Sequence, residues 1–194
     1  MNSRFSAVLL AGGQSTRMGE DKAFIELDGV PLWRQQLQLL RELEPHELFL
    51  SGPAHEEWRE NDSIIVPDAQ ADAGPLAGLV ATLRRCSAPL LVALAVDLPH
   101  MTAQHLSGLV ALCSDDVGII PRTGEHFEPV AAVYPRRSLR IAESCLATRS
   151  YSLQHFAERC VSDGLVTVKQ IHQRDESLFL NMNTPADLRA LTNV

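Results

Sequence analysis

A run of apolar residues, Pro89–Val96 (PLLVALAV), constrains the fold of this chain more than any other feature. A strand with one face in water alternates apolar and polar residues, and this run does not alternate. A continuous apolar run of this length is typical of a central strand in a parallel sheet that is covered on both faces. We therefore expect a sheet with a layer of helices on either side.

Shorter apolar runs and helical patterns alternate along the rest of the chain. The strands that this alternation predicts are Ser6–Ala11, Glu47–Ser51, Ser63–Val66, Pro89–Val96, Val117–Ile120, Pro129–Tyr134 and Leu165–Val168. The predicted helices begin at Pro31 and Gly74, cover Ala103–Leu112, Ser138–Leu146 and Ser152–Arg159, and close the chain from Pro185. This order predicts an α/β fold, a doubly wound, mostly parallel, Rossmann-like sheet. Because the sequence has no repeat or linker, we expect residues 1–194 to form a single domain.

The composition excludes several classes of protein. A formal net charge of −7 argues against a general nucleic-acid binder. The first apolar run is too short for a signal-peptide core or a membrane span, so we expect a cytoplasmic protein with no membrane partner. The four cysteines lie far apart without a Cys-x-x-Cys pair, which indicates reduced thiols: Cys86, Cys113, Cys145 and Cys160.

The loop after the first strand, Leu10–Lys22 (LAGGQSTRMGEDK), carries the features of a phosphate-binding segment. Its glycines let backbone N–H groups approach a phosphate closely. Arg17 and Lys22 add positive charge that suits a triphosphate. The spacing matches neither the Walker motif nor the dinucleotide fingerprint. The loop therefore predicts a triphosphate cradle of another type.

Two later segments place polar residues after predicted strands, where ligands bind in such sheets. Asp97 follows the central apolar run and is placed to hold Mg²⁺, which takes one or two carboxylates plus phosphate oxygens. The competing interpretation is that Asp97 caps the next helix, although Thr102 is the better cap by position. Asp68 follows the third strand, with a helix N-terminus at Gly74 close behind it.

The first of these motifs carries a family resemblance. L-A-G-G-x-S-x-R-M-G-x-D-K is similar to the opening signature of the molybdenum cofactor guanylyltransferases, within the nucleotide-diphospho-sugar transferase-like superfamily. The resemblance implies that Asp97-Leu98-Pro99 carries the metal and that Gly74–Gly78 (GPLAG) starts a helix beside the nucleotide. It also implies that Asp68 contacts the nucleotide and that Asn181 and Asn183 reach the active site.

The resemblance assigns three sets of residues. The catalytic residues are Arg17, Lys22 and Asp97, of which Asp97 is also the metal ligand. The nucleotide-binding residues are Leu10, Ala11, Gly12, Gly13, Arg17, Lys22, Ser51, Asp68, Gly74, Gly78 and Asp97. The acceptor-binding residues are Arg149, Asn181 and Asn183. Residues from about 1 to 100 form the nucleotide half of the domain, and those from about 101 to 194 form the acceptor half.

Two positions depart from the family pattern. Ser51 stands where the family has an asparagine near the base. The family's arginine before a Ser-Leu-x-x-Phe stretch falls on Tyr151 by strict spacing, while Arg149 lies two residues earlier. Whether Arg149 or Tyr151 takes that role stays open at this point.

The resemblance implies a specific reaction. GMP passes from GTP to the phosphate of molybdopterin, with or without bound molybdenum, and pyrophosphate leaves; Mg²⁺ is the cofactor. Other molybdenum cofactor biosynthesis proteins and molybdoenzyme chaperones are the implied protein partners. Two alternatives stay open: a cytidylyl- or sugar-1-phosphate nucleotidyltransferase, and a non-catalytic carrier of nucleotide or cofactor. Gly12 favours guanine over cytosine, because related cytidylyltransferases tend to have alanine there.

Overall fold

The computed structural model describes residues 5–12, 21–53, 55–60, 62–70 and 72–182 and contains a central β-sheet. Its strand order is β10-β7-β9-β6-β1-β4-β5, with β8 paired to β7. The strands are β1 Phe5–Leu10, β4 Leu48–Ser51, β5 Ile64–Val66, β6 Leu90–Ala95, β7 Gly118–Thr123, β8 His126–Phe127, β9 Ala131–Pro135 and β10 Val166–Gln170. A separate small hairpin pairs β2 Glu26–Leu27 with β3 Val30–Pro31.

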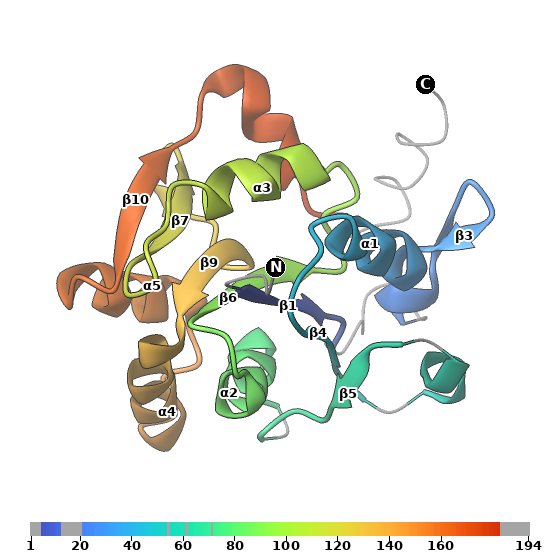
Figure 1. The fold of residues 1–194 in the computed structure, drawn as a ribbon, viewed down its shortest axis with the longest axis horizontal. Helices are drawn as coiled ribbons and strands as arrows, with labels where there is room; N and C mark the ends of the chain where they lie inside the picture. Colours follow the sequence, from blue (N-terminus) through green and yellow to red (C-terminus); the bar gives the residue numbers. More distant parts are fainter. Residues whose placement is uncertain (1–4, 13–20, 54, 61, 71, 183–194) are drawn as a thin grey trace.

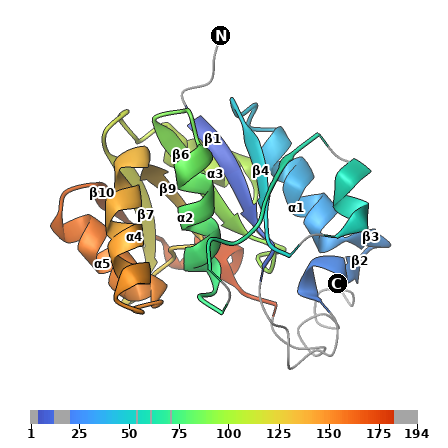
Figure 2. The ribbon, with the colours of Figure 1, turned by 90° about the horizontal axis from the view of Figure 1, so that it is seen from below.

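Helices cover both faces of this sheet, as Figure 1 shows. The α-helices are α1 Leu32–Arg41, α2 Pro75–Arg85, α3 Ala103–Val110, α4 Leu139–Ala147 and α5 Leu153–Ser162. The 3₁₀ helices are η1 Lys22–Phe24, η2 Glu56–Glu60, η3 Arg136–Ser138 and η4 Gln173–Phe179. Helices α1 and α3 lie over one face, and α2, α4 and α5 lie over the other (Figures 1 and 2). The prediction of a doubly wound α/β fold is confirmed.

The central strand β6 is buried along its whole length, as its apolar run predicts. Side chains that alternate along it enter two separate cores. Val92 and Leu94 pack on the α1 and α3 side, whereas Leu91 and Ala93 pack on the α2, α4 and α5 side. Because both faces of the sheet are covered at β6, this strand does not need to alternate apolar with polar residues.

One strand runs against the others in the main layer of the sheet. β9 pairs antiparallel with both β6 and β7, whereas the pairs β1–β4, β1–β6, β4–β5 and β7–β10 are parallel. This agrees with a mostly parallel sheet. The sequence did not predict the two-residue strands β2, β3 and β8, and the helix expected from Pro185 lies outside the described residues.

No helix in the described ranges combines the length and the apolar composition that a membrane crossing needs. All four cysteines are free and buried.

Candidate active site at the carboxyl edge of the sheet

Strands β1, β4 and β6 end at the same edge of the sheet, which brings three loops together. Leu10 lies beside Ser51 on one side and beside Ala95 on the other. Backbone bonds continue the ladder past the strand ends, since the Ala11 N–H donates to the Ser51 carbonyl at 2.8 Å. The Val96 N–H donates to the Leu10 carbonyl at 3.1 Å. The segments after these strands therefore face one another across this edge.

Lys22 and Asp97 form the central charged pair of this edge. Lys22 Nζ lies 3.1 Å from Asp97 Oδ2, and the two side chains are 21% and 22% exposed. Lys22 is the first residue of η1, whose N-cap is Asp21. The Met182 N–H donates to the Asp97 carbonyl at 2.8 Å, so the segment with Asn181 also reaches Asp97. The structure thus brings Lys22 and the segment Asn181–Met182 to Asp97.

Thr102, and not Asp97, caps α3. The Thr102 Oγ1 accepts a hydrogen bond of 3.2 Å from the His105 N–H, which is the usual contact of an N-cap side chain. The capping interpretation of Asp97 is therefore wrong, and its carboxylate pairs with Lys22.

A second carboxylate, Asp68, lies in a narrow recess between two glycines. Its Oδ1 accepts a hydrogen bond of 3.1 Å from Ser51 Oγ. A Cβ at Gly12 would come within 3.0 Å of Asp68 Oδ2, and a Cβ at Gly78 within 2.7 Å of Ser51 Oγ. Burial of the carboxyl group raises the pKa of Asp68, and the bond from Ser51 opposes that rise. Both glycines are therefore required by close packing around this carboxylate.

Helix α2 begins beside the same recess. Gly74 is its N-cap residue and Pro75 its first residue, where the missing N–H of proline costs no hydrogen bond. A helix N-terminus carries unpaired N–H groups and a partial positive charge, which favours an anion nearby. This edge of the sheet therefore has two groups that attract an anionic ligand, Lys22 and the N-terminus of α2. It also has two carboxylates, Asp97 and Asp68.

The comparisons with known proteins identify the family of this chain. The family model of the MobA-like NTP transferase domain matches residues 7–164. A probable molybdenum cofactor guanylyltransferase of Opitutus terrae is 32% identical over 188 residues, which are 95% of this chain and 93% of that protein. The chain belongs to the MobA-like NTP transferase family.

Other relatives give the same family and fold. A molybdenum cofactor guanylyltransferase of Pseudomonas putida is 32% identical over 183 residues, 93% of each chain. The solved structure of a molybdopterin-guanine dinucleotide biosynthesis protein A from Archaeoglobus fulgidus has a TM-score of 0.74 at 23% identity. That likeness covers 97% of this chain and 96% of the other, and it shows a shared fold.

Tyr151, which strict spacing puts at the family's arginine position, contacts the loop after β5. Gln70 Nε2, in the loop after β5, donates to the Tyr151 hydroxyl at 2.6 Å. Arg149 is exposed at the end of α4, with a left-handed φ of 55°, and its N–H bonds the Leu146 carbonyl. Tyr151 therefore contacts the loop that carries Asp68, whereas Arg149 closes a helix. Arg17, Gly13 and Asn183 lie outside the described residues.

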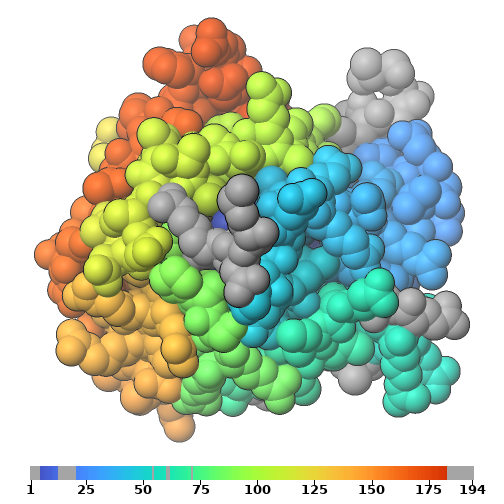
Figure 3. All heavy atoms as spheres, viewed as in Figure 1, coloured from blue at the N-terminus to red at the C-terminus, as the bar shows by residue number. Residues whose placement is uncertain are grey.

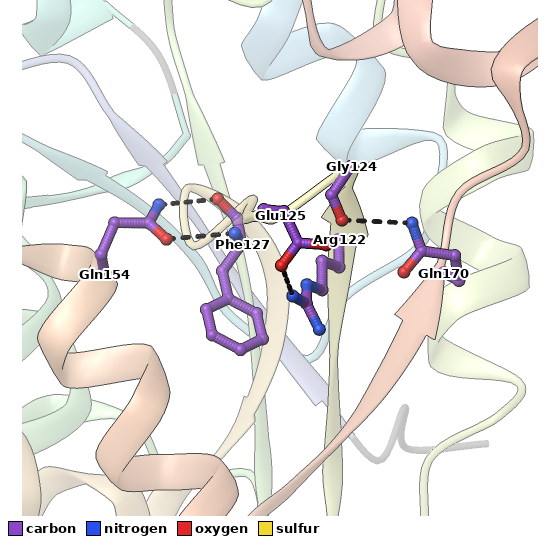
Figure 4. A network of polar contacts seen from close by, with 6 residues as sticks. All are labelled: Arg122, Gly124, Glu125, Phe127, Gln154 and Gln170. Carbon is purple, nitrogen blue, oxygen red and sulfur yellow. Dashed lines mark hydrogen bonds and ion pairs between the residues drawn. The ribbon is translucent and has the colours of Figure 1, made fainter.

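The β7–β8 hairpin at this edge was not predicted as part of the site. Gln154 of α5 bonds both backbone groups of Phe127: its Oε1 accepts from the N–H at 3.0 Å, and its Nε2 donates to the carbonyl at 2.8 Å (Figure 4). Gln170 reaches the Gly124 carbonyl from the other side at 3.5 Å (Figure 4). The hairpin is thus tied to α5 on one side and to β10 on the other.

Glu128, just after β8, is a further acid at this edge. Thr123 Oγ1 donates to its Oε1, and burial raises the pKa of the Glu128 carboxyl. Glu128 lies directly before the predicted strand Pro129–Tyr134, in the polar stretch that follows Val117–Ile120.

A hollow lined by other described residues lies apart from Lys22 and Asp97. It has a volume of about 1070 Å³ beside α1, and its lining includes Trp33, Arg34 and Gln38 but neither Lys22 nor Asp97. Figure 3 shows the face of the molecule on which α1, α3 and η4 lie.

Proposed function

We propose that this chain transfers GMP from GTP to the phosphate of molybdopterin, with Mg²⁺ as cofactor, and so forms molybdopterin guanine dinucleotide. The Lys22–Asp97 contact of 3.1 Å at the carboxyl edge carries the proposal, because it joins the triphosphate loop to the carboxylate after the central strand. The names of relatives that are 32% identical over nearly the whole chain support guanine and molybdopterin as substrates. Other cofactor biosynthesis proteins and molybdoenzyme chaperones would receive the product.

The reaction needs positioning more than acid–base chemistry. A phosphate oxygen of the acceptor forms a new bond to the α-phosphorus of GTP, while the bond from that phosphorus to the β-phosphate oxygen breaks. The bonding electrons leave with pyrophosphate. A phosphate anion is already a nucleophile at pH 7, so the site needs no general base. Catalysis then depends on in-line alignment and on neutralising charge, the task of Lys22 at the departing pyrophosphate.

The residues at the site fit Mg²⁺. The described residues contain no group of three His, Cys, Asp or Glu side chains that could form an all-protein metal site. Mg²⁺ is instead often held by one or two carboxylates together with substrate phosphates, and Asp97 is a carboxylate of that kind. When bound, Mg²⁺ would supply charge neutralisation at the phosphates. Lys22 and Asp97 are close enough to serve the same phosphates.

Donor specificity is proposed to reside in the recess around Asp68. Gly12 leaves room there only because it has no Cβ, since that atom would lie 3.0 Å from Asp68 Oδ2 and 3.2 Å from the Gly52 Cα. A carboxylate can accept hydrogen bonds from the N–H donors of a base or from the O–H donors of a ribose. Alanine at Gly12 should therefore narrow the recess and change the preferred nucleotide.

A thermal-shift panel with GTP, CTP, ATP and UTP tests the donor. A ligand at a hundredfold its Kd stabilises the folded state by about 2.7 kcal/mol. At roughly 2–4 °C per kcal/mol for a chain of this size, GTP with Mg²⁺ should raise Tm by about 5–11 °C. A larger rise with CTP would instead support a cytidylyltransferase. The same panel with EDTA measures how much of the shift requires the metal.

Pyrophosphate release tests the activity itself. Wild-type protein with GTP, Mg²⁺ and molybdopterin should release pyrophosphate, and omission of molybdopterin should abolish the release. Tight GTP binding without any pyrophosphate would support the non-catalytic carrier. A matched reaction with a sugar 1-phosphate in place of molybdopterin separates the two acceptor classes.

A further inference from the structure

The carboxylate of Asp21 has two partners, one on each oxygen. Oδ1 accepts a hydrogen bond of 3.0 Å from the Ala23 N–H and so caps the short helix η1. Oδ2 lies 3.2 Å from Nε2 of His55, in the segment that follows β4. Asp21 therefore connects the helix that carries Lys22 to a different loop of the protein.

Aromatic packing holds the imidazole of His55 in place. Its ring centroid is 4.5 Å from that of Phe24 and 4.7 Å from that of Trp58, at tilts of 58° and 61°. Trp58 is fully buried and Phe24 stacks on it, with centroids 6.4 Å apart and planes 7° from parallel. The imidazole thus has neighbours on two sides, and its orientation is set by packing.

The contact between His55 and Asp21 is shielded but not a linear hydrogen bond. Nε2 of His55 is out of solvent, and among the described residues no atom meets it with hydrogen-bond geometry. Asp21 Oδ2 is the carboxylate oxygen within ion-pair distance of it. At 3.2 Å in a partly buried place, a polar N–H or imidazolium still attracts a carboxylate electrostatically. The interaction fixes Asp21 from the side opposite to its capping bond.

The position of Lys22 depends on Asp21. Lys22 is the next residue, and η1 has only three residues, so it forms few hydrogen bonds of its own. Its first turn is held by the Asp21 cap, and the Lys22 side chain reaches from there to Asp97 at 3.1 Å. A rotation of the Asp21 carboxylate would release the cap and move the lysine.

We infer that His55 is a positioning residue of the active site: it orients Asp21, and through Asp21 it places the Lys22 ammonium beside Asp97. His55 itself does not touch the substrate in this assignment. The inference concerns the geometry of Lys22, and its catalytic consequence rests on the proposed function.

Lysine labelling tests the geometry without any turnover. Lys22 and Lys169 are the two lysines of the sequence, so Lys169 serves as an internal reference in the same molecule. The labelling rate of each amine is measured by peptide mass spectrometry in wild type, His55→Phe and His55→Gln. Phenylalanine keeps the ring packing but removes Nε2, whereas glutamine restores an N–H donor. We expect the Lys22/Lys169 ratio to rise in His55→Phe and to return toward wild type in His55→Gln.

Steady-state kinetics test the consequence for catalysis. His55→Phe should lower kcat/KM for GTP by about tenfold or more, because small misplacements of catalytic groups can cost about 10². In a Lys22→Ala background, His55→Phe should change nothing further, since its effect passes through Lys22. The matched control is His155→Phe on α5, an exposed histidine whose Nδ1 lies 3.7 Å from Glu158 Oε2. This control should leave labelling and kcat/KM unchanged.

The two experiments distinguish a failure of this inference from a failure of the proposed function. An unchanged labelling ratio in His55→Phe overturns the inference, as does an equal loss of activity with and without Lys22. If wild type has no turnover, the proposed function fails while labelling still decides the inference. Should His55→Phe not fold, Asp21→Asn replaces it, because asparagine keeps a cap oxygen and loses the charge that His55 faces. It should raise the Lys22/Lys169 ratio in the same way, and an unchanged ratio there overturns the inference too.

Discussion

Two helical glycines should respond to alanine with opposite signs. Gly78 lies within α2 and Gly108 within α3. Alanine in a helix interior is favoured over glycine by about 0.8–1.0 kcal/mol. At Gly108 a Cβ would meet none of the described atoms within 4 Å, so the full gain should appear. Gly108→Ala should therefore raise Tm by about 2–4 °C.

The same substitution at Gly78 meets packed atoms. Its Cβ would lie 2.7 Å from Ser51 Oγ, 3.0 Å from Leu10 Cδ2 and 3.3 Å from Asp68 Oδ1. Ser51 is 1% exposed and already bonded to Asp68, so its hydroxyl cannot turn into water. Overpacking of a core typically costs about 1–3 kcal/mol. Subtracting the helix gain of about 1 kcal/mol leaves a net loss of about 0–2 kcal/mol.

Urea unfolding of four variants checks this reasoning: Gly108→Ala, Gly78→Ala, Ser51→Ala and the double variant Ser51→Ala/Gly78→Ala. Removing the Ser51 hydroxyl clears the nearest contact, so the double variant should be more stable than the sum of the single effects by about 0.5–3 kcal/mol. GTP affinity should fall in Gly78→Ala and stay at the wild-type value in Gly108→Ala. If Gly78→Ala stabilises the protein as much as Gly108→Ala does, the close packing around Asp68 is refuted.

Three further changes test the acids. Asp97→Asn should lower pyrophosphate release by about 10²–10³ at unchanged circular dichroism, and near-normal turnover would exclude a charged role. Burial raises the pKa of Asp68, so ionising this carboxyl group lowers the free energy of unfolding as pH rises. In urea unfolding, Asp68→Asn should therefore add more to the free energy of unfolding at pH 7 than at pH 4. Burial also acts to raise the pKa of Glu47, but hydrogen bonds from Ser6 and Ser87 outweigh it and the pKa is lowered. Glu47 therefore contributes stability above about pH 4.3 that is lost as pH falls through its lowered pKa, and Glu47→Gln should flatten that dependence.

The direction of β9 shows what the sequence pattern leaves out. The periodicity of Pro129–Tyr134 predicts a strand, but apolar periodicity carries no information on which way a strand runs. The length of the connection between two strands does carry information on their relative direction, because a parallel crossover needs a dozen or more residues, usually with a helix. The segment between Thr123 and Ala131 is shorter than that and already contains β8. An antiparallel return from β7 was therefore the geometric expectation.

The arrangement of parallel strands explains why part of the candidate site could be expected from the sequence. Lys22 and Asp97 both come after strands of one parallel sheet, and the carboxyl ends of such strands share an edge. Their contact follows from topology. The contact between Asp21 and His55 does not, because His55 follows β4 in an irregular segment whose path depends on packing against Phe24 and Trp58. Pairwise side-chain packing of this kind has no period in the sequence.

The Lys22–Asp97 pair also resolves an electrostatic difficulty of an acidic chain that binds a triphosphate. A net charge of −7 repels such a ligand at long range, but at physiological salt charges beyond about 8 Å are largely screened. Groups at the sheet edge therefore decide binding. Before a nucleotide arrives, Lys22 and Asp97 neutralise each other at about one-fifth exposure, so neither charge is left half-buried and unpaired. A phosphate group can then take Lys22 as its partner, while Asp97 would pair with the Mg²⁺ proposed above. Each of the two charges at this edge would thus have an opposite charge beside it both without ligand and with it.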